Sequence, residues 1–228
     1  MNLDDNTHIK RLDSDNMLTH IDELPAQLQA AWNHAMSLPL PACNGVSNIV
    51  IIGMGGSAIG GSMLRSLLAE ECPAPILSNR DYQIPSFVGP DTLVIASSHS
   101  GNTEETLAAF KAAHQRGAKV ISISNGGKIA ELTEEAGGLA WQFDYDSQPR
   151  AAIGYSLLLP LALLVRLGMI RDFSADVDEA AHVLRQQQNR LGSQSPVASN
   201  PAKRLAEQML DRMVFLFAAE PLTPVARR

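Results

Sequence analysis

The chain has 228 residues, of which 45% are apolar, which is ample for one large domain, or for one domain and a fragment of another. Its formal net charge is -6, and lysines and arginines form no run longer than a pair. Binding to a nucleic acid or to an anionic membrane needs a clustered positive field, so the sequence argues against both partners. The acidic, polar N-terminus is neither a secretory signal nor a transit peptide, which favours a cytoplasmic protein.

Neither the cysteines nor the histidines are spaced as metal ligands. Cys43 and Cys72 form no C-x-x-C pattern and suit a reducing compartment. The histidines show no H-E-x-x-H or closely paired spacing. We therefore expect no metal site.

Helical and strand patterns alternate along the first three quarters of the chain. Residues 1–40 form an N-terminal helical arm, with a helix expected over 15–37 and a second run opening at Pro25. The expected strands are 48–53, 74–79, 92–98, 119–124 and 139–143, and the expected helices are 57–71, 103–116, 128–137 and one from 151. This alternation predicts an α/β fold with a doubly wound parallel sheet.

Residues 151–170 approach the roughly 20 apolar residues that cross a bilayer. Pro160 and Arg166 interrupt them, and the flanking segments are polar. We favour a helix buried in the core or in a subunit interface.

The rest of the chain reads as helices followed by one apolar run. Residues 173–211 contain a polar amphipathic helix, a link rich in Ser, Pro and Asn, and another helix, so we describe them as a helical linker region. Residues 212–228 contain an apolar run that is expected to be a buried strand. Such a strand either joins the existing sheet or begins a second domain that is truncated here.

The first candidate loop is GMGGSAIGG, residues 53–61, between a strand and a helix. Its glycines permit positive φ and close backbone approach, and the N–H groups that open the helix attract an anion. The spacing also resembles a dinucleotide fingerprint, with Asp81 a little beyond the place of a ribose-binding acid. A dinucleotide-dependent oxidoreductase therefore remains a less favoured alternative. No Gly-Lys-Ser/Thr is present, which excludes a nucleotide-triphosphate loop.

The second candidate loop is SSHSGNT, residues 97–103. The hydroxyls of Ser98, Ser100 and Thr103 can converge with N–H groups at the start of the next helix, which makes a site for a terminal phosphate. The simpler alternative is a helix cap in which Asn102 and Glu105 form a capping-box-like pair. A cap needs only one such side chain, so we favour the phosphate site.

Charged residues flank these loops. Glu104 and Glu105 suit the helix dipole but would repel a phosphate, so we expect them to point away from it, and a role as general base is the less favoured interpretation. Arg150 opens a helix, where a cation needs an anion nearby. A bound ligand and a salt bridge to Asp144 or Asp146 are equally compatible with the spacing.

Four stretches together carry a family resemblance. GMGGSAIGG, DYQIPSFVGPDTLVIASSHSGNTEET, SNGGKIAEL and PRAAIGYSLL resemble the N-terminal half of the bifunctional phosphoglucose/phosphomannose isomerases, in the sugar isomerase (SIS) domain superfamily. The resemblance extends over nearly the whole chain. It implies a flavodoxin-like five-stranded parallel sheet, a SIS domain over 41–172, a sugar-phosphate ligand and no cofactor. It also implies a homodimer, which the apolar 151–170 helix favours.

The resemblance also implies roles for single residues. The residues that match the family's binding motifs are Gly55, Gly56, Ser57, Ser98, Ser100, Thr103 and Arg150. The hydroxyls from 98–103 would bind phosphate, residues 55–57 would face the sugar, and the arginine would stabilise charge that develops on it. His99 stands where the family usually has an aromatic or other residue, and FAAE replaces the glycine-rich loop typical of a second SIS domain.

The implied reaction is aldose–ketose isomerisation of glucose 6-phosphate, fructose 6-phosphate and mannose 6-phosphate through a cis-enediol. It requires a carboxylate base, an acid for ring opening and positive charge near the enediolate. In the family, a second SIS domain supplies a glutamate in an Asn-Glu-Asn motif and a histidine, and this chain contains neither motif. Glu105 is the candidate base within it. The alternative is a non-catalytic sugar-phosphate-binding module or sensor.

Overall fold

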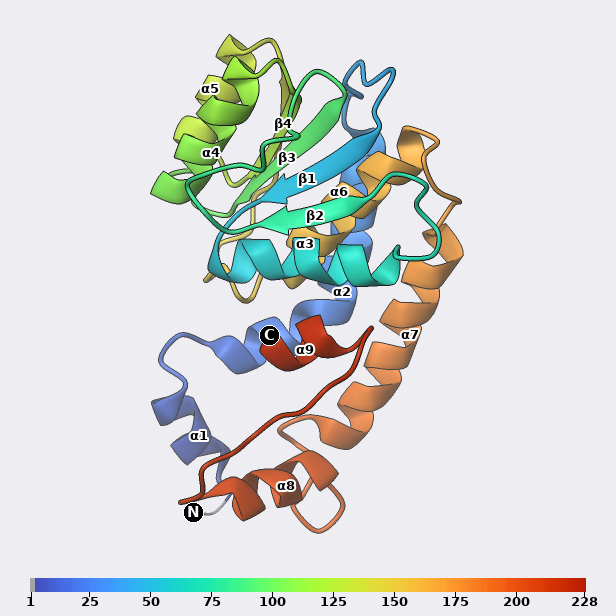
Figure 1. Cartoon of the computed structure of the whole chain (residues 1–228). Coiled ribbons are helices and arrows are strands. Elements are labelled where there is room, and N and C mark those ends of the chain that lie inside the picture. Colours follow the sequence, from blue (N-terminus) through green and yellow to red (C-terminus); the bar gives the residue numbers. More distant parts are fainter. Residues whose placement is uncertain (1–2) are drawn as a thin grey trace.

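Five parallel strands form the centre of the molecule (Figure 1). The structure is a computed structural model that describes residues 3–228. The strands are β1 Asn48–Ile52, β2 Ile76–Asn79, β3 Thr92–Ser98, β4 Lys119–Ser124 and β5 Leu139–Gln142. Their order across the sheet is β2-β1-β3-β4-β5, and every neighbouring pair is parallel. The predicted flavodoxin-like sheet is confirmed.

Helices cover both faces of this sheet (Figure 1). The helices α3 Gly55–Leu67 and α6 Ile153–Arg166 lie on one face, and α4 Glu104–Gln115 and α5 Lys128–Glu135 lie on the other. Alternate residues of the three central strands, β1, β3 and β4, enter the two cores, as Ile49 and Val50 do in β1. Because both faces are buried, the strands read as continuous apolar runs.

The apolar helix α6 is a core helix. The long helix α2 Met17–Ser37 and helix α3 pack on it, and residues such as Leu159 and Leu163 are fully buried. Other elements of the same chain thus cover the apolar surface of α6, so this helix gives no support to the expected homodimer. Among residues 3–228, no helix has both the length and the apolar character that crossing a membrane requires.

Helix α2 differs from the expected two runs, because it is one continuous helix that contains Pro25. A proline inside a helix removes one backbone hydrogen bond. Pro25 is itself buried, and the packing of α2 on α6 and on α7 Ser174–Leu191 holds the helix on both sides of it.

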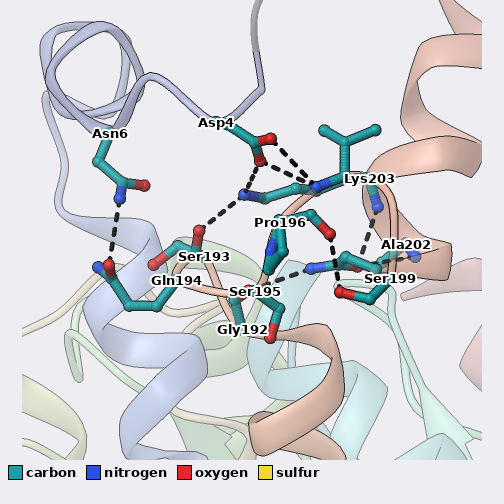
Figure 2. A network of polar contacts seen from close by, with 12 residues as sticks. Asp4, Asn6, Gly192, Ser193, Gln194, Ser195, Pro196, Ser199, Ala202 and Lys203 are labelled. Carbon is teal, nitrogen blue, oxygen red and sulfur yellow. Dashed lines mark hydrogen bonds and ion pairs between the residues drawn. The ribbon is translucent and has the colours of Figure 1, made fainter.

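The N-terminal arm is joined to the C-terminal helices by a polar cluster (Figure 2). Helix α1 Asn6–Leu12 lies near the turn between α7 and α8 Pro201–Met209. The Lys203 ammonium, on a side chain that is only 10% exposed, contacts a carboxylate oxygen of Asp4 at 2.9 Å and donates to the carbonyl of Ser193 at 2.7 Å. The sequence predicted the helices of 173–211, but no local pattern predicted this contact with the arm.

The strand expected within residues 212–228 is wrong as an element of this sheet. Residues 213–219 are extended but pair with no strand among the described residues. The short helix α9 Thr223–Arg227 then lies against α3 (Figure 1). The apolar side chains before it stay in solvent, with Met213, Phe215 and Phe217 exposed by 83%, 70% and 93%. High β-propensity predicted the extended backbone, but it does not supply a partner.

Candidate functional site

The two glycine- and hydroxyl-containing loops meet where the strand order reverses. From β1 the chain moves to one side to form β2, and then crosses back to form β3 on the other side of β1. The carboxyl ends of β1 and β3 are therefore neighbours, and ligands of open α/β sheets bind at such a switch point. Residues 53–57 follow β1 and residues 98–103 follow β3, so the fold brings together the two loops that sequence analysis selected.

The first loop brings the start of α3 close to the backbone of residues 149–150. Gly55 has φ +50°, which only glycine adopts without strain. A Cβ on Gly56 would lie 2.6 Å from the carbonyl carbon of Pro149 and 2.7 Å from the amide nitrogen of Arg150. Ser57, in the first turn, is only 6% exposed. Gly55 permits the turn and Gly56 permits the close approach, so the two positions need glycine for different physical reasons.

The hydroxyls of the second loop lie at the start of α4. The Oγ atoms of Ser98 and Thr103 are 3.0 Å apart, so one donates to the other and one hydroxyl hydrogen remains for a further acceptor. Ser98 is buried, whereas the Ser100 side chain is exposed and accepts from the amide of Asn102 at 3.2 Å. Thr103 is the N-cap and makes no side-chain cap bond. The first-turn N–H groups of α4 therefore lack a side-chain cap and are suited to an anion.

The alternative in which Asn102 and Glu105 form a capping box at α4 is wrong, because Thr103 and not Asn102 is the N-cap residue. Asn102 instead binds the neighbouring loop: its Oδ1 accepts from the amide of Lys128, the first residue of α5, at 3.0 Å. The amide of Asn125 donates to the carbonyl of His99 at 2.9 Å. The loop after β4 thus braces the 98–103 loop through contacts that do not use the Ser98 and Thr103 hydroxyls.

The backbone of Arg150 lies beside the first loop, at Gly56, and its side chain is exposed. Its guanidinium is 3.8 Å from a carboxylate oxygen of Asp15, and not beside Asp144 or Asp146 as the spacing allowed. Asp15 precedes α2, so sequence separation concealed this partner. The pair is solvent-exposed, with side chains 57% and 53% accessible, and such pairs contribute little to stability. Arg150 can therefore exchange Asp15 for a ligand anion at small cost.

Gln27 is a site-supporting residue that sequence analysis missed. It is buried on α2, donates to the carbonyl of Ala151 at 3.0 Å and accepts from the amide of Gly154 at 2.7 Å. These two bonds hold the turn that carries Arg150 against α2. A lone glutamine on an amphipathic helix gives no sequence signal of such a role.

His99 connects the two loops at the floor of the site. Its amide donates to Ser57 Oγ at 3.0 Å, and its ring lies edge-on to Phe143 with centroids 5.7 Å apart. The imidazole Nε2 is buried and has no hydrogen-bond partner among residues 3–228. His99 lines a cavity of about 10 Å³ together with Ser57 and Ser156. Burial lowers the pKa of the His99 imidazole, which favours its neutral form.

The acidic pair of α4 lies near the loop after β2. The charges of Glu104 and Glu105 contribute to a raised pKa of the Tyr82 hydroxyl, after its desolvation. At the end of β2, the Asn79 amide donates to the carbonyls of Asp81 and Gln83. An amide therefore ends the strand where a dinucleotide fold would place a carboxylate. Across residues 3–228, no three His, Cys, Asp or Glu side chains are grouped as metal ligands.

Comparison with known proteins agrees with this geometry. The family model described as the SIS domain matches residues 44–136, which include both loops. The bifunctional phosphoglucose/phosphomannose isomerase of Caldicellulosiruptor bescii is 38% identical over 210 residues, which cover 92% of this chain and 62% of that protein. The protein of the same description from Thermoplasma acidophilum is 37% identical over 186 residues, which cover 80% of this chain and 53% of that protein.

A solved structure agrees on the fold. A hypothetical protein from Thermus thermophilus superposes with a TM-score of 0.61 at 21% identity, over 91% of this chain and 51% of that chain. The present chain spans less than two thirds of the length of each of these three proteins. Residues 44–136 therefore match the SIS domain family, and most of the chain is similar to the bifunctional phosphoglucose/phosphomannose isomerases, as its motifs predicted.

Proposed function

We propose that this chain is the phosphate-binding part of a sugar-phosphate isomerase that interconverts glucose 6-phosphate, mannose 6-phosphate and fructose 6-phosphate. The observation that carries the proposal is the meeting of the 53–57 and 98–103 loops at the β1/β3 switch point. A hexose 6-phosphate has an anionic end and a neutral, hydroxyl-rich end. The start of α4 suits the phosphate, and the start of α3 suits the hydroxyl-rich end of the sugar.

In this proposal the phosphate binds the Ser100 and Thr103 hydroxyls and the first-turn amides of α4, with Ser98 supporting Thr103. Gly55, Gly56 and Ser57 face the sugar. The phosphate holds the reacting carbons in place, since binding energy from a non-reacting group can be used for positioning.

The proton transfer between C1 and C2 needs two kinds of group. Arg150 would turn from Asp15 towards the substrate and stabilise the enediolate charge. A carboxylate must then move the proton between the two carbons. The resemblance places that carboxylate in a second SIS domain, and Glu105 is the candidate within this chain.

The domain organisation is proposed on the same basis. Residues 1–40 are the helical arm, 41–172 the SIS domain and 173–211 the helical linker region, and residues 212–228 begin a second SIS domain. The exposed Phe215 and Phe217 support the last assignment, because large exposed apolar side chains mark a surface that another element covers. We further propose that the protein acts in the cytoplasm as a homodimer, without a cofactor.

A binding titration and a turnover assay on the same samples test the proposal. Fructose 6-phosphate should raise the unfolding temperature of the chain, and Ser100→Ala/Thr103→Val should abolish that rise, whereas the exposed Ser86→Ala should not. Turnover to glucose 6-phosphate that is lost in the double variant would place a base within these residues. Stabilisation without turnover would favour the alternative, a sugar-phosphate-binding module, or a need for the second domain. No stabilisation would refute the phosphate site.

A further inference from the structure

A second cationic cavity lies outside the candidate site, between α3, the end of β2 and α9. It has a volume of about 220 Å³ and is lined by Ser62, Arg65, Ser78, Arg80, Glu220, Thr223, Pro224 and Arg227. We name it the arginine cavity. Helix α9 lies beside α3 (Figure 1), and Thr223, Pro224 and Arg227 of α9 form one side of the arginine cavity. Three guanidinium groups and three hydroxyls thus face one space that holds a single carboxylate.

The single carboxylate of the arginine cavity is already paired. Glu220 lies 3.6 Å from Arg65 and accepts from the Ser66 hydroxyl at 2.9 Å. Among residues 3–228, Arg80 and Arg227 have no carboxylate within salt-bridge distance. Two guanidinium groups of the arginine cavity therefore have no ion-pair partner in the described part of the chain.

The guanidinium of Arg80 is held in place. It donates to the Oγ of Ser62 at 2.8 Å, and that hydroxyl also bonds the carbonyl of Ala58 at 3.3 Å. Ser62 is buried, with 8% exposure. Desolvation and then the charge of Arg227 lower the pKa of Arg80, which is the sign expected for two cations that share a space without a counter-ion. A planar guanidinium in a fixed orientation suits bidentate binding of phosphate oxygens.

We propose that the arginine cavity binds a phosphate group, as inorganic phosphate or a phosphate monoester, at a site separate from the 98–103 loop. Arg80 and Arg227 would bind its oxygens, and Thr223 and Ser78 would donate from the walls. The volume of the cavity is several times the roughly 30 Å³ that one water occupies, so a tetrahedral dianion fits. This proposal does not depend on the proposed isomerase function.

The test measures phosphate binding after the first site has been removed. In the Ser100→Ala/Thr103→Val background, calorimetric titration with inorganic phosphate at constant ionic strength should give one site. Arg80→Gln and Arg227→Gln should each weaken that affinity by about tenfold, the loss expected for one charge-assisted hydrogen bond. Arg190→Gln, on the exposed face of α7, is the charge-matched control and should leave the affinity for phosphate unchanged.

Two results would overturn the proposal: no phosphate binding in the background variant, or equal affinities in Arg80→Gln, Arg227→Gln and Arg190→Gln. Unfolding temperatures in chloride show whether each variant folds. If Arg80→Gln does not fold, Arg227→Gln decides the test, because Arg227 is exposed and its substitution should leave the core intact. Titration with glucose 6-phosphate in the same background distinguishes a free phosphate ligand from a phosphate monoester.

Discussion

The Oγ of Ser57 accepts a hydrogen bond from the backbone N–H of His99 at 3.0 Å, although the two residues follow different strands. Ser57 is buried, so water does not compete for this bond. The start of α3 and the 98–103 loop are therefore fixed relative to each other. In the proposed function this bond sets the distance between the sugar and the phosphate subsites.

Ser57→Ala tests that connection. The substitution leaves the His99 amide without an acceptor in a partly buried place, which costs about 1–3 kcal/mol. We expect the free energy of unfolding in urea to fall by about that amount, and the affinity for fructose 6-phosphate to fall with it. Ser86→Ala, at an exposed position, should change stability by less than about 0.5 kcal/mol. Equal stability of the two variants would show that the bond does not connect the loops.

Gly56→Ala tests the close approach of α3 to the turn that carries Arg150. The added Cβ would meet the backbone of Pro149 and Arg150 at 2.6–2.7 Å, and that backbone cannot move without shifting the Arg150 side chain. We expect a loss of about 1–3 kcal/mol in unfolding free energy, as for overpacking, together with weaker ligand binding.

Gly89→Ala is the matched control for Gly56→Ala. A Cβ on Gly89 would have its nearest neighbours at 3.9 and 4.0 Å, and its φ is not positive. Because alanine restricts the unfolded chain more than glycine does, Gly89→Ala should be neutral or stabilising by about 0.4–1 kcal/mol. Similar losses in both variants would mean that the close approach at Gly56 has no special importance.

Much of the site could be predicted because the signals are local. Buried parallel strands read as apolar runs, and a helix that begins just after such a strand marks an anion site. The failures involve contacts between distant segments. The less favoured alternative made Asn102 the cap of its own helix, but its side chain accepts from the amide of Lys128 at the start of α5. Arg150 pairs with Asp15 from the N-terminal arm. Gln27 carries no motif, since its role comes only from the packing of α2 on α6.

His99 should make stability depend on pH. Burial is the largest effect on its imidazole and lowers its pKa below the ordinary value of 6.5, against smaller opposing effects from Tyr145 and Asp146. At pH values above the pKa that His99 has in the unfolded chain, neither the folded nor the unfolded chain binds the proton, so the contribution of His99 to stability is constant. As pH falls below it, the unfolded chain binds a proton that the folded chain does not, so stability falls until the folded pKa is reached.

Urea unfolding between about pH 5 and pH 8, where an ordinary histidine titrates, measures this contribution. The parent protein should lose stability towards the acid end, and His99→Gln should lose less. His182→Gln, at an exposed position of α7, should follow the parent. If His99→Gln and His182→Gln have the same pH dependence, the buried imidazole does not titrate as its surroundings predict.

Asp4→Ala should release the N-terminal arm without unfolding the SIS domain. Asp4 contacts the ammonium of Lys203 and accepts from the amide of Val197 at 2.9 Å (Figure 2). Removal of the carboxylate takes the acceptor from that amide and leaves the poorly exposed Lys203 with the carbonyl of Ser193. Hydrogen exchange at Val197 should then accelerate by at least about tenfold, since a bond to a charged group is lost, while exchange in β1 and β3 stays as slow as in the parent.

Asp5→Ala is the matched control. It removes the neighbouring carboxylate, which caps α1 through the amides of Thr7 and His8, so it should leave the exchange of Val197 unchanged. If Asp5→Ala accelerated that exchange as much as Asp4→Ala, the arm would be held by α1 as a whole and not by the Asp4–Lys203 contact.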